Sequence, residues 1–173
     1  RTSRIERTYE GTLRVRSVKG VLRLIVTMDF ESYVAGVLAA ELPSGPRESR
    51  RAQSIVIRTY GLHRDGRHTL SDVCDLTHCQ VFKDYGDSKD IEVVRSTQGL
   101  VLSAYGELAH GFYSSTCGGR TADYLEVWPG VASTHGPTSV VDVSSDGRSW
   151  CESSPHFHWR FDLSRRELFE ILK

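Results

Sequence analysis

One acidic side chain occupies a position where the surrounding pattern predicts an apolar one. Apolar residues between Tyr33 and Leu38 recur at helical spacing, and the next position on their stripe is Glu41. A carboxylate on an apolar stripe is costly unless it is paired or protonated. Partial desolvation favours the protonated form, which a general acid needs at neutral pH. The pattern therefore predicts either a general acid or a buried ion pair with Arg51 or Arg58.

A second group of chemically active residues follows between positions 74 and 79. Cys74, His78 and Cys79 place two thiolates and an imidazole within six positions. Such a set can bind Zn²⁺ when a fourth ligand completes a tetrahedron, and His68 and Cys151 are the candidates for that ligand. The alternative is a disulfide between Cys74 and Cys79 in an oxidising compartment. We favour the metal because an imidazole adjoins the second thiol.

Two helices joined by a sharp corner are predicted to position Glu41. Asp29 is the expected N-cap of the first helix. Pro43 ends that helix, because the residue before a proline avoids helical geometry. Pro46 is expected in the first turn of the second helix, where its missing N–H costs nothing. The predicted apolar face of the second helix consists of Ala52, Ile55, Val56, Thr59 and Leu62.

Short strands and helices account for the rest of the chain. Strands are expected at 8–15, 20–27, 100–104, 108–113 and 157–163, helices at 91–97 and 164–172, and turns at 19–20, 105–106, 128–130 and 135–137. Strands and helices are segregated, so the predicted fold class is α+β. We expect one domain over residues 1–173, in which antiparallel β hairpins pack on the central helix pair and a C-terminal helix. Residues 1–25 would form the N-terminal hairpin.

Composition narrows the class of protein. The 173 residues carry 22 basic and 22 acidic side chains, a balance that argues against a non-specific nucleic-acid binder. No stretch is long and apolar enough to span a bilayer. No signal peptide is present at Arg1, and we expect that an export signal has been removed. The four cysteines fit two disulfides in an exported protein, or a metal site with spare thiols.

Four motifs occur in one order along the chain: YVAGVLAAELP, RAQSIVIRTYGL, DVCDLTHCQVF and FYSSTCGGRT. Together they resemble the SpoIID-type (sporulation stage II protein D) lytic transglycosylase domain, which amidase enhancers share. The resemblance covers a family core over residues 26–172. It implies an exported enzyme of the bacterial cell envelope that acts on peptidoglycan glycan strands, with a preference for peptide-free strands.

The resemblance also implies roles for particular residues. Glu41 matches the catalytic glutamate of the family. Cys74, His78 and Cys79 form a Cys/His cluster, and family members that carry this cluster bind zinc. The matching segments assign substrate binding to Arg58, Tyr60, Tyr113, Ser114, Ser115, Thr116, Gly118, Gly119 and Arg120. Cys117 stands where the family usually has Ser, which leaves open whether this thiol is free or bonded. We expect a Cys117–Cys151 disulfide if Cys151 is not a metal ligand.

The implied reaction breaks the MurNAc–GlcNAc β-1,4 bond without water. One carboxylic acid protonates the leaving oxygen and then accepts the proton of the MurNAc C6 hydroxyl, which closes a 1,6-anhydro ring. Ordinary glycosidases need two carboxylates, whereas this route needs one. One alternative is a glycan-binding module that stimulates a partner amidase. Another is a thiol hydrolase that uses Cys117 with His110 or His135.

Overall fold

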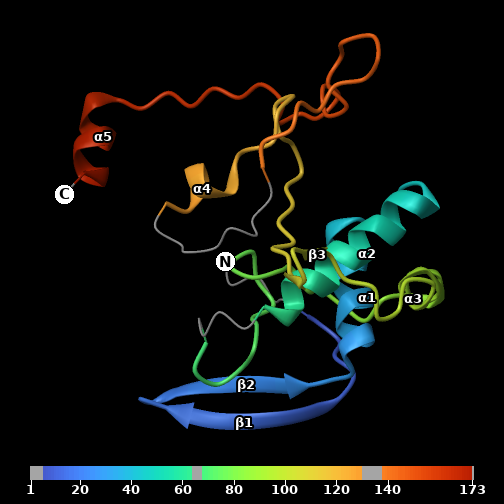
Figure 1. The fold of residues 1–173 in the computed structure, drawn as a ribbon. Helices are drawn as coiled ribbons and strands as arrows, with labels where there is room; N and C mark the ends of the chain where they lie inside the picture. Colours follow the sequence, from blue (N-terminus) through green and yellow to red (C-terminus); the bar gives the residue numbers. More distant parts are fainter. Residues whose placement is uncertain (1–5, 64–67, 130–137, 173) are drawn as a thin grey trace. The chain divides into compact units, whose positions relative to one another are not determined.

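A computed structural model describes residues 6–63, 68–129 and 138–172 (Figure 1). The chain divides into two compact units, Arg1–Phe112 and Tyr113–Lys173, and each is described by itself. The single domain expected over 1–173 stays a prediction. The α+β class is confirmed, because the described chain combines helices with two antiparallel two-stranded sheets. No described helix has the length and apolar character needed to cross a membrane.

The first unit contains most of the regular structure. Its elements are β1 (Thr12–Val18), β2 (Val21–Thr27), α1 (Phe30–Glu41), α2 (Arg47–Leu62), α3 (Ser88–Arg95), β3 (Ser103–Ala104) and β4 (Glu107–Leu108). Helices α1, α2 and α3 contact one another pairwise. They form the core of this unit.

Helix α1 is the central element of that core. Asp29 is its N-cap, as predicted, and the Asp29 carboxylate accepts a hydrogen bond from the Ser32 N–H at 3.1 Å. The helix ends at Glu41, two residues before Pro43, also as predicted. Six consecutive residues, Tyr33 to Leu38, are buried. Since six residues span more than one turn, α1 is covered on every side over this stretch.

Helix α2 does not bury the face that its apolar residues predicted. Ala52 and Leu62 are exposed, and Ile55 and Val56 are half-buried, so the predicted apolar face is wrong for most of its members. The buried residues are Arg50, Ser54, Ile57, Arg58 and Thr59. Polar contacts with α1 and α3 explain this rotation, because they pair the buried charges of Arg50 and Arg58 with carboxylates.

Arg58 makes the most extensive of these contacts. It is 2% exposed, and its guanidinium binds both oxygens of Glu31 on α1, at 2.9 and 2.7 Å. The same group donates to the backbone carbonyl of Leu100 at 3.0 Å. On the α3 side, Arg50 pairs with Asp90, and both side chains are buried. Two charge-assisted contacts therefore join α2 to its neighbours, and such bonds are stronger than neutral ones.

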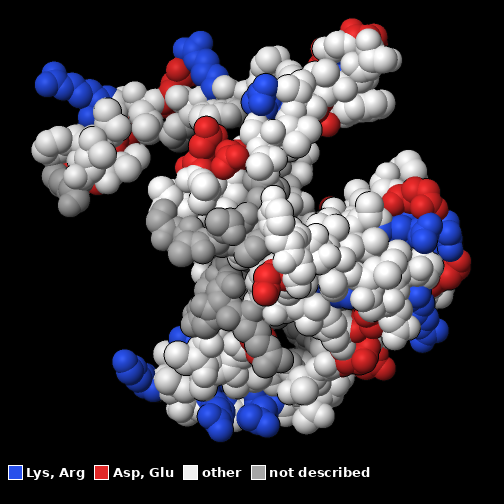
Figure 2. All heavy atoms as spheres, in the orientation of Figure 1, with Lys and Arg blue, Asp and Glu red and all other residues white. Residues whose placement is uncertain are grey.

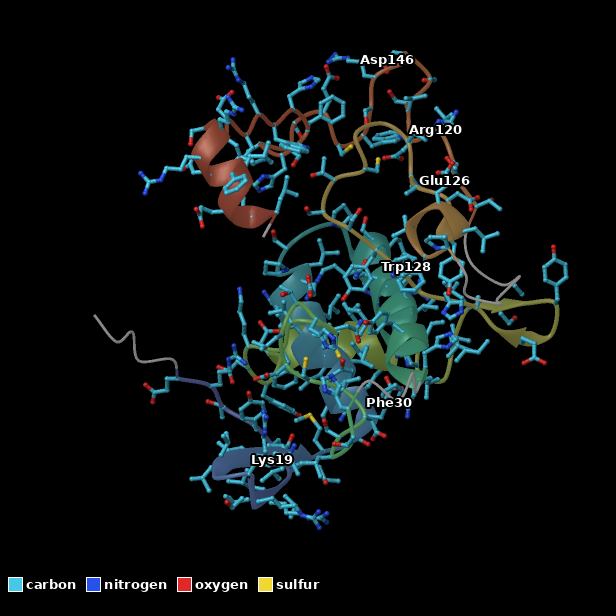
Figure 3. The ribbon with its side chains drawn as sticks, turned by 90° about the vertical axis from the view of Figure 1, so that its left-hand side faces the viewer. Lys19, Phe30, Arg120, Glu126, Trp128 and Asp146 are labelled. Carbon is cyan, nitrogen blue, oxygen red and sulfur yellow. The ribbon has the colours of Figure 1, made fainter. Side chains whose placement is uncertain are left out.

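Both predicted hairpins are present, with their turns where the sequence placed them. Lys19 and Gly20 have φ angles of 50° and 76°, and Tyr105 and Gly106 have 54° and 84°. Positive φ at both central residues is the type I′ geometry that suits the twist of a hairpin. Figure 3 shows Lys19 at the tip of β1–β2, and Figure 2 shows basic side chains over this hairpin.

The strand bounds differ from the prediction. Strand β1 begins at Thr12 rather than at residue 8, because Gly11 has a φ of 131°, which is outside the extended region. Strands β3 and β4 have two residues each and are shorter than predicted. Apolar residues of β1–β2 are largely exposed, including Leu13, Leu22 and Leu24.

The second unit has little regular structure. It contains α4 (Tyr124–Val127), which the sequence analysis did not predict, and α5 (Arg165–Ile171), which the Ser164–Glu167 capping box begins as expected. Two isolated bridges, Arg120↔Val141 and Val143↔Ser149, join its loops. The strand predicted at 157–163 is wrong: this segment pairs with nothing described and begins in a turn closed by the Phe157 N–H and the Ser154 carbonyl. The turn predicted at 135–137 lies outside the described residues.

The Arg58–Glu31 pair, in which Arg58 is buried and Glu31 is half-buried, gives a prediction for stability. Glu31→Gln leaves the Arg58 charge buried without a carboxylate, and breaking a buried pair costs about 3–5 kcal/mol. We expect a loss of about 3 kcal/mol or more in the free energy of unfolding, measured by urea titration. Glu48→Gln is the control, because the Glu48–Arg51 pair has exposed side chains, 73% and 35%, and should contribute about 1 kcal/mol or less. Equal losses in the two variants would show that the buried pair does not hold α2 in place.

Candidate functional site

Glu41 lies at the end of α1 and is exposed. Its Oε1 accepts a hydrogen bond from the Val81 N–H at 2.9 Å, and within the described residues its Oε2 has no hydrogen-bond partner. The expectation of a desolvated acid on an apolar stripe is therefore wrong. The buried stretch of α1 ends at Leu38, and the last turn extends beyond the packed neighbours. One carboxylate oxygen is fixed, and the other is open.

The ion-pair alternative for Glu41 is also excluded. The arginines named as its partners bind other carboxylates of the first unit. Arg58 binds Glu31, and Arg51 binds Glu48 at 2.7 Å.

The loop that carries Val81 is anchored on the buried face of α1. Gln80 is 1% exposed, and its side-chain oxygen accepts a hydrogen bond from the Tyr33 hydroxyl at 2.8 Å. Phe82 is 2% exposed and stacks on Tyr33, with ring centroids 6.2 Å apart. Gly36 makes room for this ring, because a Cβ at position 36 would overlap it. These contacts hold the residues on both sides of Val81, so they fix the N–H that binds Glu41.

The same loop is held on its other side by the N-terminal segment. The Asp75 carboxylate accepts a hydrogen bond from the Tyr9 hydroxyl at 2.6 Å and pairs with Arg7. Tyr9 also stacks on Phe82 at 5.4 Å. The hydrogen bond with Asp75 and the burial of the ring raise the pKa of Tyr9, with burial the larger cause. Residues 7–9 are thus part of the support for the loop.

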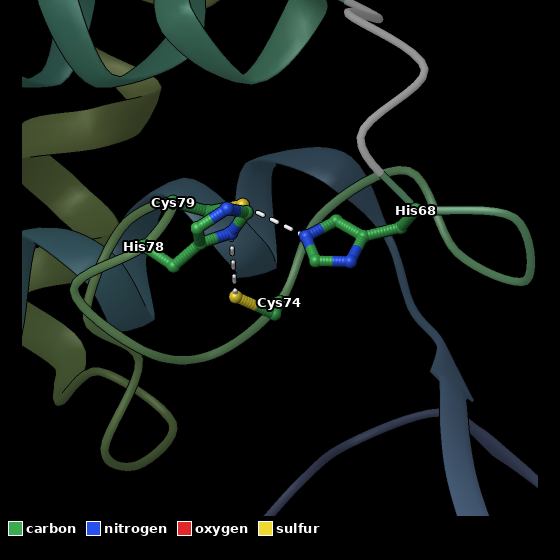
Figure 4. Close-up of side chains that lie close together, drawn as sticks. All are labelled: His68, Cys74, His78 and Cys79. Carbon is green, nitrogen blue, oxygen red and sulfur yellow. Dashed lines mark hydrogen bonds between the residues drawn. The ribbon is translucent and has the colours of Figure 1, made fainter. Parts of the chain in front are cut away.

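The Cys/His cluster lies within this loop (Figure 4). His68, Cys74, His78 and Cys79 each offer one ligand atom, and these atoms all lie within 4.8 Å of one another. The His68 Nε2 is 3.2 Å from the Cys79 Sγ, and the His78 Nδ1 is 3.9 Å from the Cys74 Sγ. Two imidazoles and two thiols form a donor set of the kind that holds structural zinc. Of the two predicted fourth ligands, the structure brings His68 to the cluster.

The RTY segment, residues 58–60 of α2, has a structural role. Arg58 cannot contact a glycan, because it is 2% exposed and its guanidinium is bound to Glu31 and to backbone carbonyls. The prediction that it binds substrate is wrong. Tyr60 is half-buried and packs edge-on against Phe112, with ring centroids 6.1 Å apart. His110 stacks on Phe112 at 5.5 Å in the same aromatic group.

The small-residue loop of the second unit, residues 114–121, has some residues that are hydrogen-bonded to other segments and some that are exposed. Gly118 and Gly119 have φ angles of 69° and 95°, a backbone conformation that side chains disfavour. The Gly119 carbonyl accepts a hydrogen bond from the Asp142 N–H at 2.9 Å, and the Thr116 hydroxyl bonds the Ser154 hydroxyl at 2.6 Å. Exposed members of the loop are Ser114, Ser115, Gly118 and Arg120. Substrate binding by this loop stays a prediction.

Cys117 in this loop lies beside a carboxylate that no sequence motif indicated. Its Sγ donates a hydrogen bond to Asp142 at 3.1 Å and lies 3.5 Å from the Cys151 Sγ. The bond to Asp142 is the largest of the causes that raise the pKa of Cys117 to about 11. A thiol that stays protonated at neutral pH is a poor nucleophile. This weighs against the thiol hydrolase, whose second candidate base, His135, lies outside the described residues.

Comparison with known proteins identifies the family. The model of the SpoIID family, described as stage II sporulation protein, matches residues 18–104, about half of the chain. The matched range contains the α1–α2 pair, Glu41 and the Cys/His cluster. The chain therefore belongs to the SpoIID family.

Two relatives give further similarity. The chain is 31% identical to an amidase enhancer of Bacillus subtilis (strain 168) over 135 residues, which are 77% of this chain and 17% of that protein. It is 27% identical to an uncharacterized protein of Brachyspira hyodysenteriae over 119 residues, 65% of this chain and 32% of that protein. The chain thus spans less than a third of the length of either relative.

The contact between Gly36 and Phe82 gives a second prediction. In Gly36→Ala the new methyl overlaps the Phe82 ring and lies 2.8 Å from the Asp84 carbonyl oxygen. We expect a loss of about 1–3 kcal/mol in the free energy of unfolding by urea, the usual cost of overpacking. Gly61→Ala is the control, because its nearest neighbours lie 3.1 Å away or more and the gain in helix propensity is about 1 kcal/mol. Similar results for the two variants would mean that the ring can move aside freely.

Proposed function

We propose that this chain is a peptidoglycan lytic transglycosylase in which Glu41 is the general acid and base. The observation that carries the proposal is the orientation of the Glu41 carboxylate. The Val81 N–H binds its Oε1 at 2.9 Å. No described residue forms a hydrogen bond with its Oε2, so this oxygen is open to a substrate. Membership of the SpoIID family supports the same assignment.

The reaction needs one group that first gives and then takes a proton. Protonated Glu41 donates to the glycosidic oxygen as the bond to MurNAc C1 breaks. The resulting carboxylate then accepts the proton of the MurNAc C6 hydroxyl while O6 bonds to C1. A polymer that covers a carboxyl group excludes water and favours its neutral form, which is the form needed at the start.

The helix that carries Glu41 supports a mechanism with a single acid. A two-carboxylate glycosidase needs a second acid free to act as a nucleophile or a base. The acids at the start of α1 already have other roles, because Asp29 caps the helix and Glu31 binds Arg58. The C6 hydroxyl of the substrate then takes the place of the second group.

Zinc at the Cys/His cluster is the second part of the proposal. His68, Cys74, His78 and Cys79 would supply four ligands, and a site closed by four protein ligands is structural. Val81 follows two residues after Cys79, so the metal would fix the loop whose N–H orients Glu41. The metal would thus act through the position of Glu41.

Glycan binding is proposed for the loop of the second unit. Ser114 and Ser115 are exposed hydroxyls, and Gly118 leaves the backbone open to a ligand. Tyr113, Thr116, Gly119 and Arg120 complete the proposed set. We place the protein in the cell envelope, after export, on the strength of its family.

A second candidate function is enhancement of a partner amidase. The observation that favours it is the 31% identity to a protein named amidase enhancer. In this case the chain binds glycan and stimulates a partner N-acetylmuramoyl-L-alanine amidase, and Glu41 is not required for cleavage.

Replacement of Glu41 tests the leading proposal. Glu41→Gln keeps the shape of the side chain but cannot exchange the proton. We expect a loss of at least about 10²-fold in 1,6-anhydro-MurNAc product, since general acid–base catalysis contributes about 10²–10⁴-fold. The measurement is mass spectrometry of products from peptide-stripped glycan strands, with strand binding assayed in parallel. Glu48→Gln, an exposed glutamate on α2, is the control.

The products separate the candidate functions. Anhydro product that disappears only in Glu41→Gln supports the transglycosylase. Reducing-end MurNAc from the wild type would identify a hydrolase. Strand binding without any product, together with faster release of stem peptides from intact peptidoglycan by an added amidase, would identify the enhancer.

Metal removal tests the zinc site. We expect about one zinc ion per chain in protein purified without added metal, as a four-ligand site implies. Chelation or His68→Ala should lower the melting temperature and the activity together, because the loop that binds Glu41 loses its support. His156→Ala, an exposed histidine, is the control. Zinc-free protein in which Cys74 and Cys79 resist alkylation would contradict the proposal and indicate a disulfide.

A further inference from the structure

A pair of sulfur atoms lies where three segments of the second unit meet. Cys117 comes from the small-residue loop, Asp142 from the segment next to the Arg120↔Val141 bridge, and Cys151 from the turn after Ser149. The two Sγ atoms are 3.5 Å apart, and the Asp142 Oδ2 is 3.1 Å from the Cys117 Sγ. The Ser149 hydroxyl lies 3.2 Å from the Cys151 Sγ.

We propose that Cys117 and Cys151 are a disulfide-forming pair that closes the second unit, and that Cys151 is the sulfur that reacts first. The proposal does not depend on the function of Glu41. It assigns a covalent modification to Cys117.

The weak packing of the second unit is the first argument. Among its described residues, Tyr124 alone is buried, and α5 buries no residue. Segments that bury little apolar surface depend on cross-links. A bond between positions 117 and 151 would enclose both isolated bridges and would restrict the unfolded chain over a long loop.

The different environments of the two thiols are the second argument. Hydrogen bonds with Ser149 and, to a smaller extent, with Cys117 lower the pKa of Cys151 to about 7. The pKa of Cys117 is raised to about 11, chiefly by its bond to Asp142. At neutral pH, Cys151 is therefore the better nucleophile, whereas Asp142 keeps Cys117 protonated.

The oxidant required is another disulfide, either a small molecule or an oxidised thiol–disulfide oxidoreductase. The Cys151 thiolate attacks one sulfur of this disulfide, forms a mixed disulfide and releases one thiolate. Cys117 then loses its proton to water, and its sulfur attacks the Cys151 sulfur of the mixed disulfide and releases the second thiolate. Two cysteines lose two electrons, and the external disulfide gains them.

The competing occupant of these side chains is a metal ion. Cys117, Asp142 and Cys151 have ligand atoms close enough together to share one. Structural zinc sites have four protein ligands, and no fourth histidine, cysteine or carboxylate joins this group within the described part of the chain. We therefore assign the pair to a disulfide, and metal content is an outcome of the test.

The first measurement is mass spectrometry of the wild-type chain purified without reductant. It is denatured in the presence of N-ethylmaleimide and then digested. We expect a linked peptide pair that contains Cys117 and Cys151, and alkylated peptides that contain Cys74 and Cys79. Alkylation of both Cys117 and Cys151, or a second zinc ion per chain, would overturn the proposal.

The second measurement follows bond closure in reduced protein that is treated with glutathione disulfide. In the wild type we expect the mixed disulfide on Cys151 to accumulate before the bond closes, because Asp142 keeps Cys117 protonated. Asp142→Asn should speed the closure step by at least about tenfold, because loss of the carboxylate lowers the pKa of Cys117 and increases the fraction of its thiolate. Asp146→Asn, an exposed aspartate of the same unit, is the control. Glutathione on Cys117, or closure at the wild-type rate in Asp142→Asn, would overturn the roles assigned to these residues.

Discussion

The guanidinium of Arg58 and the carboxylate of Glu31 form the contact on which the first unit depends. Arg58 is buried on the face of α2 that meets α1, and it also binds the carbonyl of Leu100. One side chain therefore ties together α1, α2 and the segment that leads into the second hairpin. A charge can be buried in this way only when its hydrogen-bonding groups are satisfied.

Helix α1 connects the Arg58–Glu31 contact to the candidate site. Its buried stretch holds Tyr33 and Gly36, and these residues contact Gln80 and Phe82 on the loop. Val81 lies between them and donates its N–H to Glu41, which ends the same helix. The helix and the loop thus position one carboxylate from two sides, while the carboxylate itself remains exposed. A functional group held by packed supporting residues on regular elements keeps a precise position.

Local signals predicted much of the fold. The ends of α1 follow from Asp29 and Pro43, and the type I′ turns follow from Lys19–Gly20 and Tyr105–Gly106, because each depends on a few adjacent residues. The buried face of α2 could not be predicted in this way, since hydrophobic periodicity assumes that apolar residues are the buried ones. Arg58 is buried because Glu31 lies opposite it, and that proximity arises only in the folded chain.

The candidate site shows the same division. The sequence analysis identified Glu41 and the Cys/His cluster as candidate functional residues. His68 was one of its two candidates for the fourth ligand of the cluster, and the structure places it there. The exposure of Glu41 and its bond to Val81, and the approach of Asp142 to Cys117, depend on segments far apart in the chain. No local pattern carries that information.

The fit of Phe82 against Gly36 constrains how such sequences can diverge. A larger residue at the position of Gly36 would meet both the Phe82 ring and the Asp84 carbonyl oxygen, so it requires a smaller residue at position 82 and a shift of the backbone at position 84. A larger residue at position 36 alone would push on the loop that carries the Val81 N–H, the donor to Glu41. The two positions therefore link the sequence of a buried helix to that of a surface loop, although neither residue needs to touch a ligand.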